Sequence, residues 1–135
     1  MKSILVCYEE RPVAGRLLER AAWFATLTGA KVIVTSVAPV LHGRGGGIDP
    51  VDPPARHEDE VQEAVSRLEE LGVESVETVV GIGDPPTAIV SLAEERGVDL
   101  IVLGAHDGGL LSRLFEGSTS DAVVHRAGTD VLVVR

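Results

Sequence analysis

The residues that could carry chemistry in this chain are concentrated between Asp99 and Ser120, in the stretch DLIVLGAHDGGLLSRLFEGSTS. The apolar run 100–103 predicts a buried strand that ends at Gly104, and a glycine-rich loop follows it. A new helix is expected to begin at Gly117-Ser118. Glycines let backbone N–H groups approach a ligand, and the unpaired N–H groups of a first helical turn attract anions. This order of strand, loop and helix start favours a phosphate site.

Individual side chains in this stretch have two readings each. Ser118 and Asp121 fit a capping box, which would be an ordinary helix start worth about 1 kcal/mol, or Ser118 and its neighbouring N–H groups could bind phosphate. His106 follows the strand, where it could donate to a phosphate or remain a surface histidine. The other histidines show no metal-ligand spacing. Cys7 lies inside an apolar strand and is expected to pack there.

No catalytic constellation is recognisable in the sequence. Neither a Ser-His-Asp order nor a Cys-His pair has supporting context, and the adjacent carboxylates Glu9-Glu10 are the only candidates for acid–base chemistry. An enzyme active site is therefore not predicted, and neither is a metal site.

The elements that must position these residues alternate along the chain. Apolar periodicity, β-branched runs and glycine stops predict strands at 3–8, 31–37, 74–80, 100–104 and 131–134, and helices at 13–28, 58–71, 85–96 and 118–126. Asp84 and Pro85 form a typical helix start. Such alternation predicts one domain over 1–135, an α/β fold with an open, doubly wound parallel sheet and helices on both faces. In these sheets, ligands bind at the carboxyl ends of the strands where the strand order reverses.

One long segment interrupts the alternation. Residues 38–56 are rich in proline and glycine and have no periodicity, so we expect a surface loop that could cover the end of the preceding strand as a flap. The sequence HGRGGG within it lacks the Gly-Lys-Ser/Thr ending and the following helix of a phosphate loop.

Composition narrows the classes of partner. Of the residues, 44% are apolar, and 12 basic against 21 acidic side chains give a formal charge of -9. A field of this sign disfavours nucleic acid and anionic membranes. The single Cys7 cannot form an internal disulfide, and we see no signal peptide or membrane span, so a cytoplasmic protein is expected.

The first strand, the Gly-Asp-Pro before the third helix, DLIVLGAH and the closing GSTSDAVVHRAGTDVLVV together resemble the universal stress protein family. The resemblance covers nearly the whole chain apart from the proline-rich segment. It implies a Rossmann-like sheet with strand order 3-2-1-4-5. It also implies a homodimer that pairs the strand at 131–134, whose edge is otherwise open.

The ATP-binding branch of this family carries a motif of Gly, two residues, Gly, nine residues, Gly and Ser/Thr. On this chain Gly104 takes the first position and Gly117-Ser118 the last, but Asp107 replaces the middle glycine. A carboxylate there would repel a triphosphate by on the order of 1–4 kcal/mol at a surface-like dielectric. With Mg²⁺ present, the same carboxylate could become a ligand.

Other positions of the family's nucleotide site are implied as well. Glu9 replaces an aspartate that contacts the nucleoside, and Val37 matches the residue whose backbone reads the adenine. Leu103 and His106 fall on lining positions, and Thr119 follows Ser118 in the first helical turn. The resemblance thus implies ATP, with Mg²⁺, as the ligand. A non-nucleotide, dimeric regulatory or partner-binding module is the alternative, and a slow ATPase is a third reading.

Overall fold

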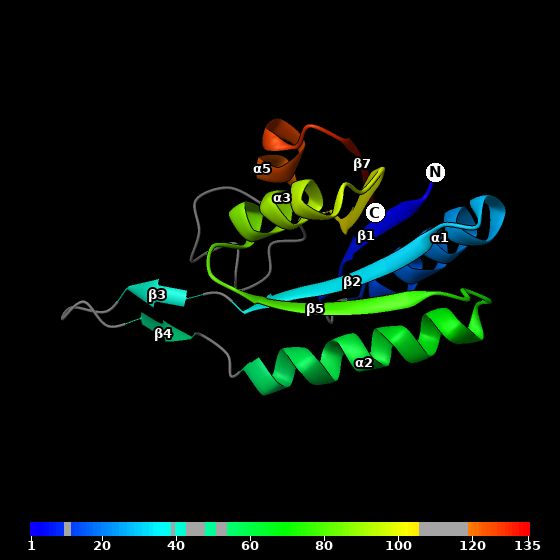
Figure 1. Ribbon diagram of the computed structural model, residues 1–135. Helices are drawn as coiled ribbons and strands as arrows, with labels where there is room; N and C mark the ends of the chain where they lie inside the picture. The colour runs from blue at the N-terminus through cyan, green and yellow to red at the C-terminus, as the bar shows by residue number, and fades with distance from the viewer. Residues whose placement is uncertain (10–11, 39, 43–47, 51–53, 106–118) are drawn as a thin grey trace.

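Five parallel strands form the central layer of the structure (Figure 1). The computed structural model describes residues 1–9, 12–38, 40–42, 48–50, 54–105 and 119–135. The sheet has the order β5-β2-β1-β6-β7, with β1 at Ser3–Cys7, β2 at Lys31–Ala38, β5 at Val76–Ile82, β6 at Leu100–Gly104 and β7 at Asp130–Val134. In the order of the main strands along the chain this is 3-2-1-4-5, so the predicted fold class is confirmed.

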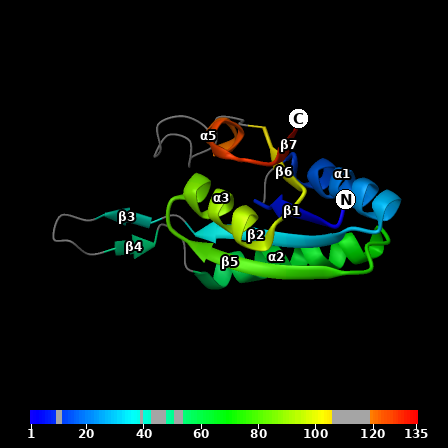
Figure 2. The same cartoon turned by 45° about the horizontal axis from the view of Figure 1, so that its top comes forward.

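Helices cover both faces of the sheet (Figures 1 and 2). On one face, α1 (Ala14–Thr28) and α2 (Pro54–Glu70) pack over a core that includes Ile4, Val6, Val32 and Val34. On the other, α3 (Pro85–Arg96) and α5 (Thr119–Arg126) pack over Leu5, Ile33, Ile101 and Leu103. Because successive side chains of a strand point to opposite faces, strands buried on both sides are mostly apolar, as the central strands β1 and β6 are.

Local signals explain where α3 begins and ends. The Asp84 carboxylate accepts a hydrogen bond from the backbone N–H of Thr87 at 3.3 Å, and Pro85 is the first helical residue. At the other end Gly97 adopts φ 61°, a left-handed conformation that glycine reaches without strain. The predicted helix start and stop are both confirmed.

The segment at 38–56 contains more structure than we expected. β3 (Val40–His42) and β4 (Ile48–Pro50) pair in antiparallel fashion, and α2 begins at Pro54 rather than at residue 58. The expected loop thus includes a short hairpin, and its last residues belong to α2, whose first turn tolerates proline well. The paired strands extend away from the layers, beyond the end of β2, and do not lie over the sheet as a flap would (Figures 1 and 2).

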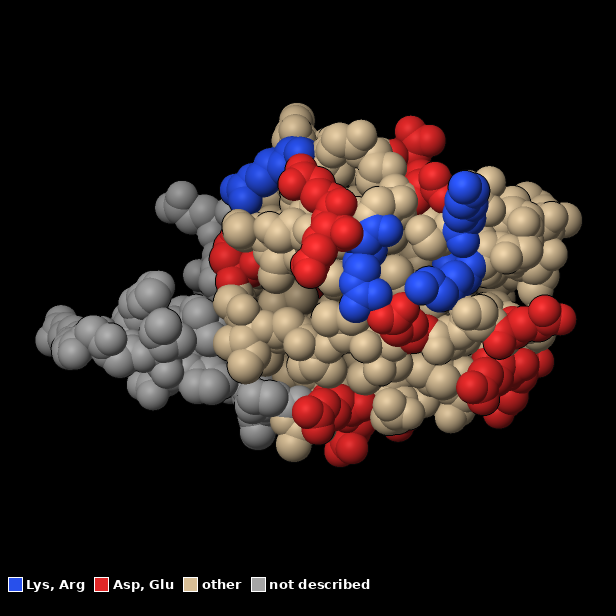
Figure 3. Space-filling view, in the orientation of Figure 1, with Lys and Arg blue, Asp and Glu red and all other residues tan. Residues whose placement is uncertain are grey.

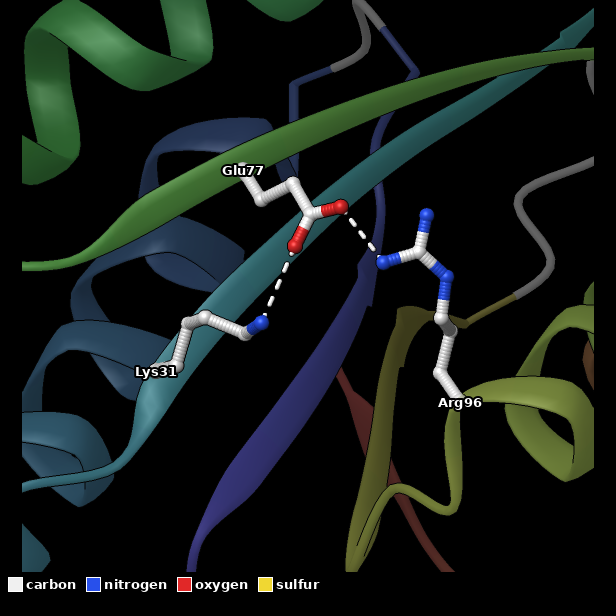
Figure 4. A network of polar contacts seen from close by, with 3 residues as sticks. All are labelled: Lys31, Glu77 and Arg96. Carbon is white, nitrogen blue, oxygen red and sulfur yellow. Dashed lines mark hydrogen bonds and ion pairs between the residues drawn. The ribbon is translucent and has the colours of Figure 1, made fainter.

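A charged network fixes the edge strand β5 at the amino end of the sheet. The Glu77 carboxylate accepts hydrogen bonds from Lys31 Nζ of β2, at 3.0 Å, and from the guanidinium of Arg96 at the end of α3 (Figure 4). Both hydrogen bonds lower the pKa of Glu77, and the one from Arg96 has the larger effect. The network thus joins an edge strand to its neighbour and to a helix.

Charge is unevenly spread over the surface. In the view of Figure 3, acidic side chains gather along the rim that α2 forms and at its carboxyl end, while most basic ones lie over the region of α3 and the amino ends of the strands. Among the described residues, no helix is both long and apolar enough to cross a membrane.

Candidate functional site

The strand order reverses between β1 and β6, which are neighbours in the sheet. They pair in parallel, with Cys7 opposite Leu103, and on its other side β1 pairs with β2, with Cys7 opposite Thr35. The chain leaves β1 toward β2 and β5, and later returns to β6 and β7 on the other side. The sequence prediction required these two strands to be adjacent, so its placement of the switch point is confirmed.

Three of the expected site residues converge at this carboxyl edge. Val37 and Leu103 pack in the same core cluster, on the face that α3 and α5 cover, and the half-buried Cys7 lies between their strands. Glu9 lies two residues after the end of β1 and is partly buried. The backbone N–H of Tyr8 donates to the carbonyl of Thr35 at 2.8 Å, which keeps the chain next to β2 up to this point.

Gly104 ends β6 under close packing from the first turn of α1. A Cβ atom at this position would lie 2.8 Å from Cγ1 of Val13, closer than real Cβ contacts. Val13 is β-branched and has little freedom to move aside. The glycine is therefore required by the approach of α1 to the strand, independently of any ligand.

The surroundings of Cys7 disfavour its thiolate form. Burial, and after it the negative charge of Glu9, raises the pKa of the Cys7 thiol above its ordinary range. The thiolate is the nucleophilic form, so the environment favours packing over reactivity. The expectation that it packs is confirmed.

The remaining predicted site residues fall largely outside the described part of the chain. These are His106, Asp107, Gly117 and Ser118. Thr119 is the first residue of α5 and is partly exposed, and Ser120 behind it is buried. The backbone N–H of Ala105 donates to the carbonyl of Val134 at 2.7 Å, so the chain leaves the sheet beside the end of β7.

A buried polar cluster escaped the sequence analysis. Ser36 of β2 lies 2.5 Å from His57 Nδ1 and 3.2 Å from a Glu60 carboxylate oxygen, both on α2. The serine and histidine are 21 positions apart, so only the packing of α2 on β2 brings them together. Among the described residues no group of three or more His, Cys, Asp or Glu side chains could hold a metal ion.

An open parallel sheet with its candidate site at the switch point defines a Rossmann-like α/β protein. The model of the "Universal stress protein family" matches residues 1–135, and the chain belongs to this family. This confirms the resemblance drawn from the sequence.

Individual relatives agree with this assignment. A universal stress protein of Methanocaldococcus jannaschii is 35% identical over 68 residues, which are 50% of this chain and 41% of that protein. The chain spans about half the length of the curated relatives it matches.

Solved structures match along the whole chain. A universal stress protein in complex with cAMP has a TM-score of 0.77 and 27% identity, covering 99% of this chain and 96% of that one. The universal stress protein from Archaeoglobus fulgidus in complex with dAMP has a TM-score of 0.71 and 27% identity, covering 100% and 98%.

Proposed function

We propose that this protein binds an adenine nucleotide at the carboxyl edge of β1, β2 and β6. The observation that carries the proposal is the position of Glu9, Val37 and Gly104 at the carboxyl ends of three neighbouring strands, where the strand order reverses. Related structures with bound cAMP and dAMP support the same class of ligand. In this arrangement Val37 would contact the adenine through its backbone, and Glu9 the nucleoside.

The phosphates would lie against the first turn of α5. Thr119 begins this helix, and the N–H groups of a first helical turn attract anions. Ser118, Gly117 and His106 are assigned to the same region by the sequence motif. Asp107 would favour a ligand with less negative charge, or one whose charge is reduced by Mg²⁺.

Calorimetric titration tests this proposal. ATP with and without Mg²⁺, AMP and cAMP would each be titrated into the native protein and into Asp107→Gly. We expect saturable binding of at least one nucleotide. Tighter ATP binding by the variant identifies Asp107 as an obstacle, and weaker binding only with Mg²⁺ present identifies it as a metal ligand. If no nucleotide binds to either protein, the proposal is wrong and a partner-binding module becomes the better reading.

The same titration mixture separates binding from turnover. Phosphate release from ATP over hours that is lost in Gly117→Ala or Ser118→Ala would assign a slow ATPase. If nucleotide binding is measurable but the phosphate concentration does not rise, the protein binds nucleotide without hydrolysing it. We propose binding without catalysis, and this assay decides between the two.

We also propose that the protein forms a homodimer through β7. This edge strand pairs with β6 alone among the described strands. Beside it runs a groove of about 710 Å³, bounded by α1 side chains, Trp23 among them, and by Leu132 and Val134. Trp23 is 54% exposed, and together with Leu132 and Val134 it gives this groove apolar surface that a second copy could cover.

A two-fold axis at β7 would cover both the open edge of this strand and the groove beside it. Antiparallel pairing of two β7 strands would satisfy the backbone groups of each edge, and the groove of each copy would receive side chains of the other. Sedimentation equilibrium of the native chain should give the mass of two chains, and a monomer at all concentrations would refute this part of the proposal.

A further inference from the structure

The buried cluster of Ser36, His57 and Glu60 lies where β2 and α2 meet. The exposed fractions of these residues are 2%, 4% and 8%. Burying polar groups of this kind costs free energy unless they are hydrogen-bonded. The question is what the cluster does, because the candidate nucleotide site lies on the opposite face of the same strand.

Ser36 bridges two residues of α2. Its hydroxyl donates to a Glu60 carboxylate oxygen at 3.2 Å. The same hydroxyl oxygen lies 2.5 Å from His57 Nδ1, in a hydrogen bond whose direction depends on the tautomer of the ring. The three side chains thus form a chain that crosses from helix to strand and back.

This geometry does not suit acyl-transfer chemistry. Both Ser36 and Glu60 approach the same ring nitrogen, Nδ1, at 2.5 and 3.6 Å. A Ser-His-acid triad needs its nucleophile and its carboxylate on opposite nitrogens. Ser36 is also out of reach of solvent, so the cluster holds elements together and is not a nucleophilic site.

The position of the cluster in the chain is its most informative property. Ser36 lies two residues before the end of β2, and His57 lies in the first turn of α2. The whole segment 39–53, with the β3–β4 hairpin, connects these two points. The cluster therefore links the end of β2 to the start of α2, the two points of the chain that this segment connects.

The cluster is also adjacent to the site. Val37 follows Ser36 directly, and its side chain packs on the opposite face with Leu103. The carbonyl of Ala38 accepts from the N–H of Gly83 at 3.0 Å, so the end of β2 is held on the β5 side too. A displacement of Ser36 would move the backbone of Val37, the group proposed to contact adenine.

Other groups around the cluster are few among the described residues. Arg56, on α2, lies 3.6 Å from the second Glu60 oxygen and is largely exposed. From β1 the buried Tyr8 lies on the same face of the sheet, and β5 contributes the apolar Val76 and Val80. Glu60, Ser36 and His57 thus form a polar link between this part of α2 and β2.

We propose that Ser36, His57 and Glu60 are positioning residues that clamp the end of β2 and thereby place the Val37 backbone for adenine binding. The inference rests on the proposed nucleotide site for its consequence, although the clamp itself can be measured without nucleotide. Its members act through Val37 and do not touch the ligand.

Amide hydrogen exchange of the nucleotide-free protein tests the clamp. In Ser36→Ala, exchange at Val37 and Ala38 should accelerate on the order of tenfold, the ratio expected when a buried hydrogen-bond partner is lost, while exchange at Val6 and Val102 stays near native. Ser66→Ala is the matched control, because that exposed hydroxyl bonds only to the Gln62 carbonyl one turn back in its own helix. Unchanged exchange at Val37, or equal acceleration throughout the sheet, would overturn the clamp.

Nucleotide affinity tests the consequence. Glu60→Ala should weaken binding of whichever nucleotide the native chain accepts by on the order of tenfold, and Glu60→Gln should recover most of it, since its amide oxygen still accepts from Ser36. Glu63→Ala, an exposed change on the same helix, should have no effect. Native affinity in Glu60→Ala would refute the positioning role. If the native protein binds no nucleotide, the proposed function and this role both fail, and the exchange data still decide whether the clamp exists.

Discussion

At the scale of single residues, Gly104 is the site position whose identity the structure explains most directly. Its Cα faces Val13 Cγ1 at a distance that leaves no room for a Cβ atom. A glycine of a nucleotide motif can be required by the ligand or by the fold, and here the fold alone is sufficient. The two requirements can be separated by mutation.

We predict that Gly104→Ala lowers the free energy of unfolding by about 1–3 kcal/mol, the usual cost of overpacking a well-filled contact. Val13→Ala should remove the clash, so the double variant should be less destabilised than the sum of the single ones. Urea unfolding of the four proteins measures the coupling. Additive effects would show that Val13 is not the obstacle. Separately, the nucleotide affinity of the double variant would show whether ligand binding also requires a glycine at position 104.

Glu77 gives a second prediction at this scale, for pH. The hydrogen bonds from Arg96 and Lys31 place its pKa in the folded protein below the ordinary 4.5, so the unfolded chain binds this proton more readily. The carboxylate thus contributes stability above pH 4.5 that disappears as the pH falls through the lowered value.

Urea unfolding at neutral and acid pH measures this contribution. The native protein should be more stable than Glu77→Gln at neutral pH, and the difference should shrink toward zero on acidification. Glu74→Gln, an exposed change just before the strand, is the control and should show little difference at either pH. A difference that grows at low pH would contradict the sign of the shift.

At the scale of elements, the sequence predicted those whose signals are local. Asp84 and Pro85 mark a helix start through the chemistry of the first turn alone, and the apolar strands follow from burial on both faces. The hairpin was missed because β3 and β4 are only three residues long, too short for a periodic pattern. The early start of α2 was missed because its first residues are not apolar at helical spacing.

The β7 edge carries the element-scale prediction. Leu132→Lys places a charge in the groove beside Trp23, where the second copy would have to desolvate it. We expect the dimer to weaken by tenfold or more, on the order of 1.4 kcal/mol. Because Leu132 also packs against the core, urea unfolding measures the accompanying loss of monomer stability separately. Light scattering over a concentration series reports the mass. Val124→Lys, on α5 at a position that is 48% exposed and does not line the groove, should leave the dimer intact.

At the scale of the whole molecule, the predicted site was partly accessible from sequence. The strand alternation located the switch point, so the convergence of Glu9, Val37 and Gly104 could be expected. The cluster around Ser36 could not, because it depends on which face of β2 the serine occupies and on where α2 begins. The polar pair Thr35-Ser36 inside a mostly apolar strand was the available signal, and the partners of Ser36 are not recognisable in the sequence.

Net charge gives the last prediction. With 21 acidic and 12 basic side chains, repulsion over the surface opposes the compact state. Raising NaCl from about 20 mM to about 500 mM shortens the Debye length from tens of ångströms to a few, so the melting temperature should rise. Glucose at equal osmolality controls for solvent effects. A fall in melting temperature would mean that screening of ion pairs such as that of Glu77 outweighs the relief of repulsion.

The two edge strands of the sheet, β5 and β7, differ in character, and this difference limits how many chains can assemble. The β5 margin carries the charged Glu77 network, a feature that discourages strand addition, whereas the β7 margin is apolar and open. A sheet whose two edge strands could both pair with further copies would grow into a continuous ribbon. Here the proposed pairing occupies β7, the edge open to pairing, so assembly should stop at two chains.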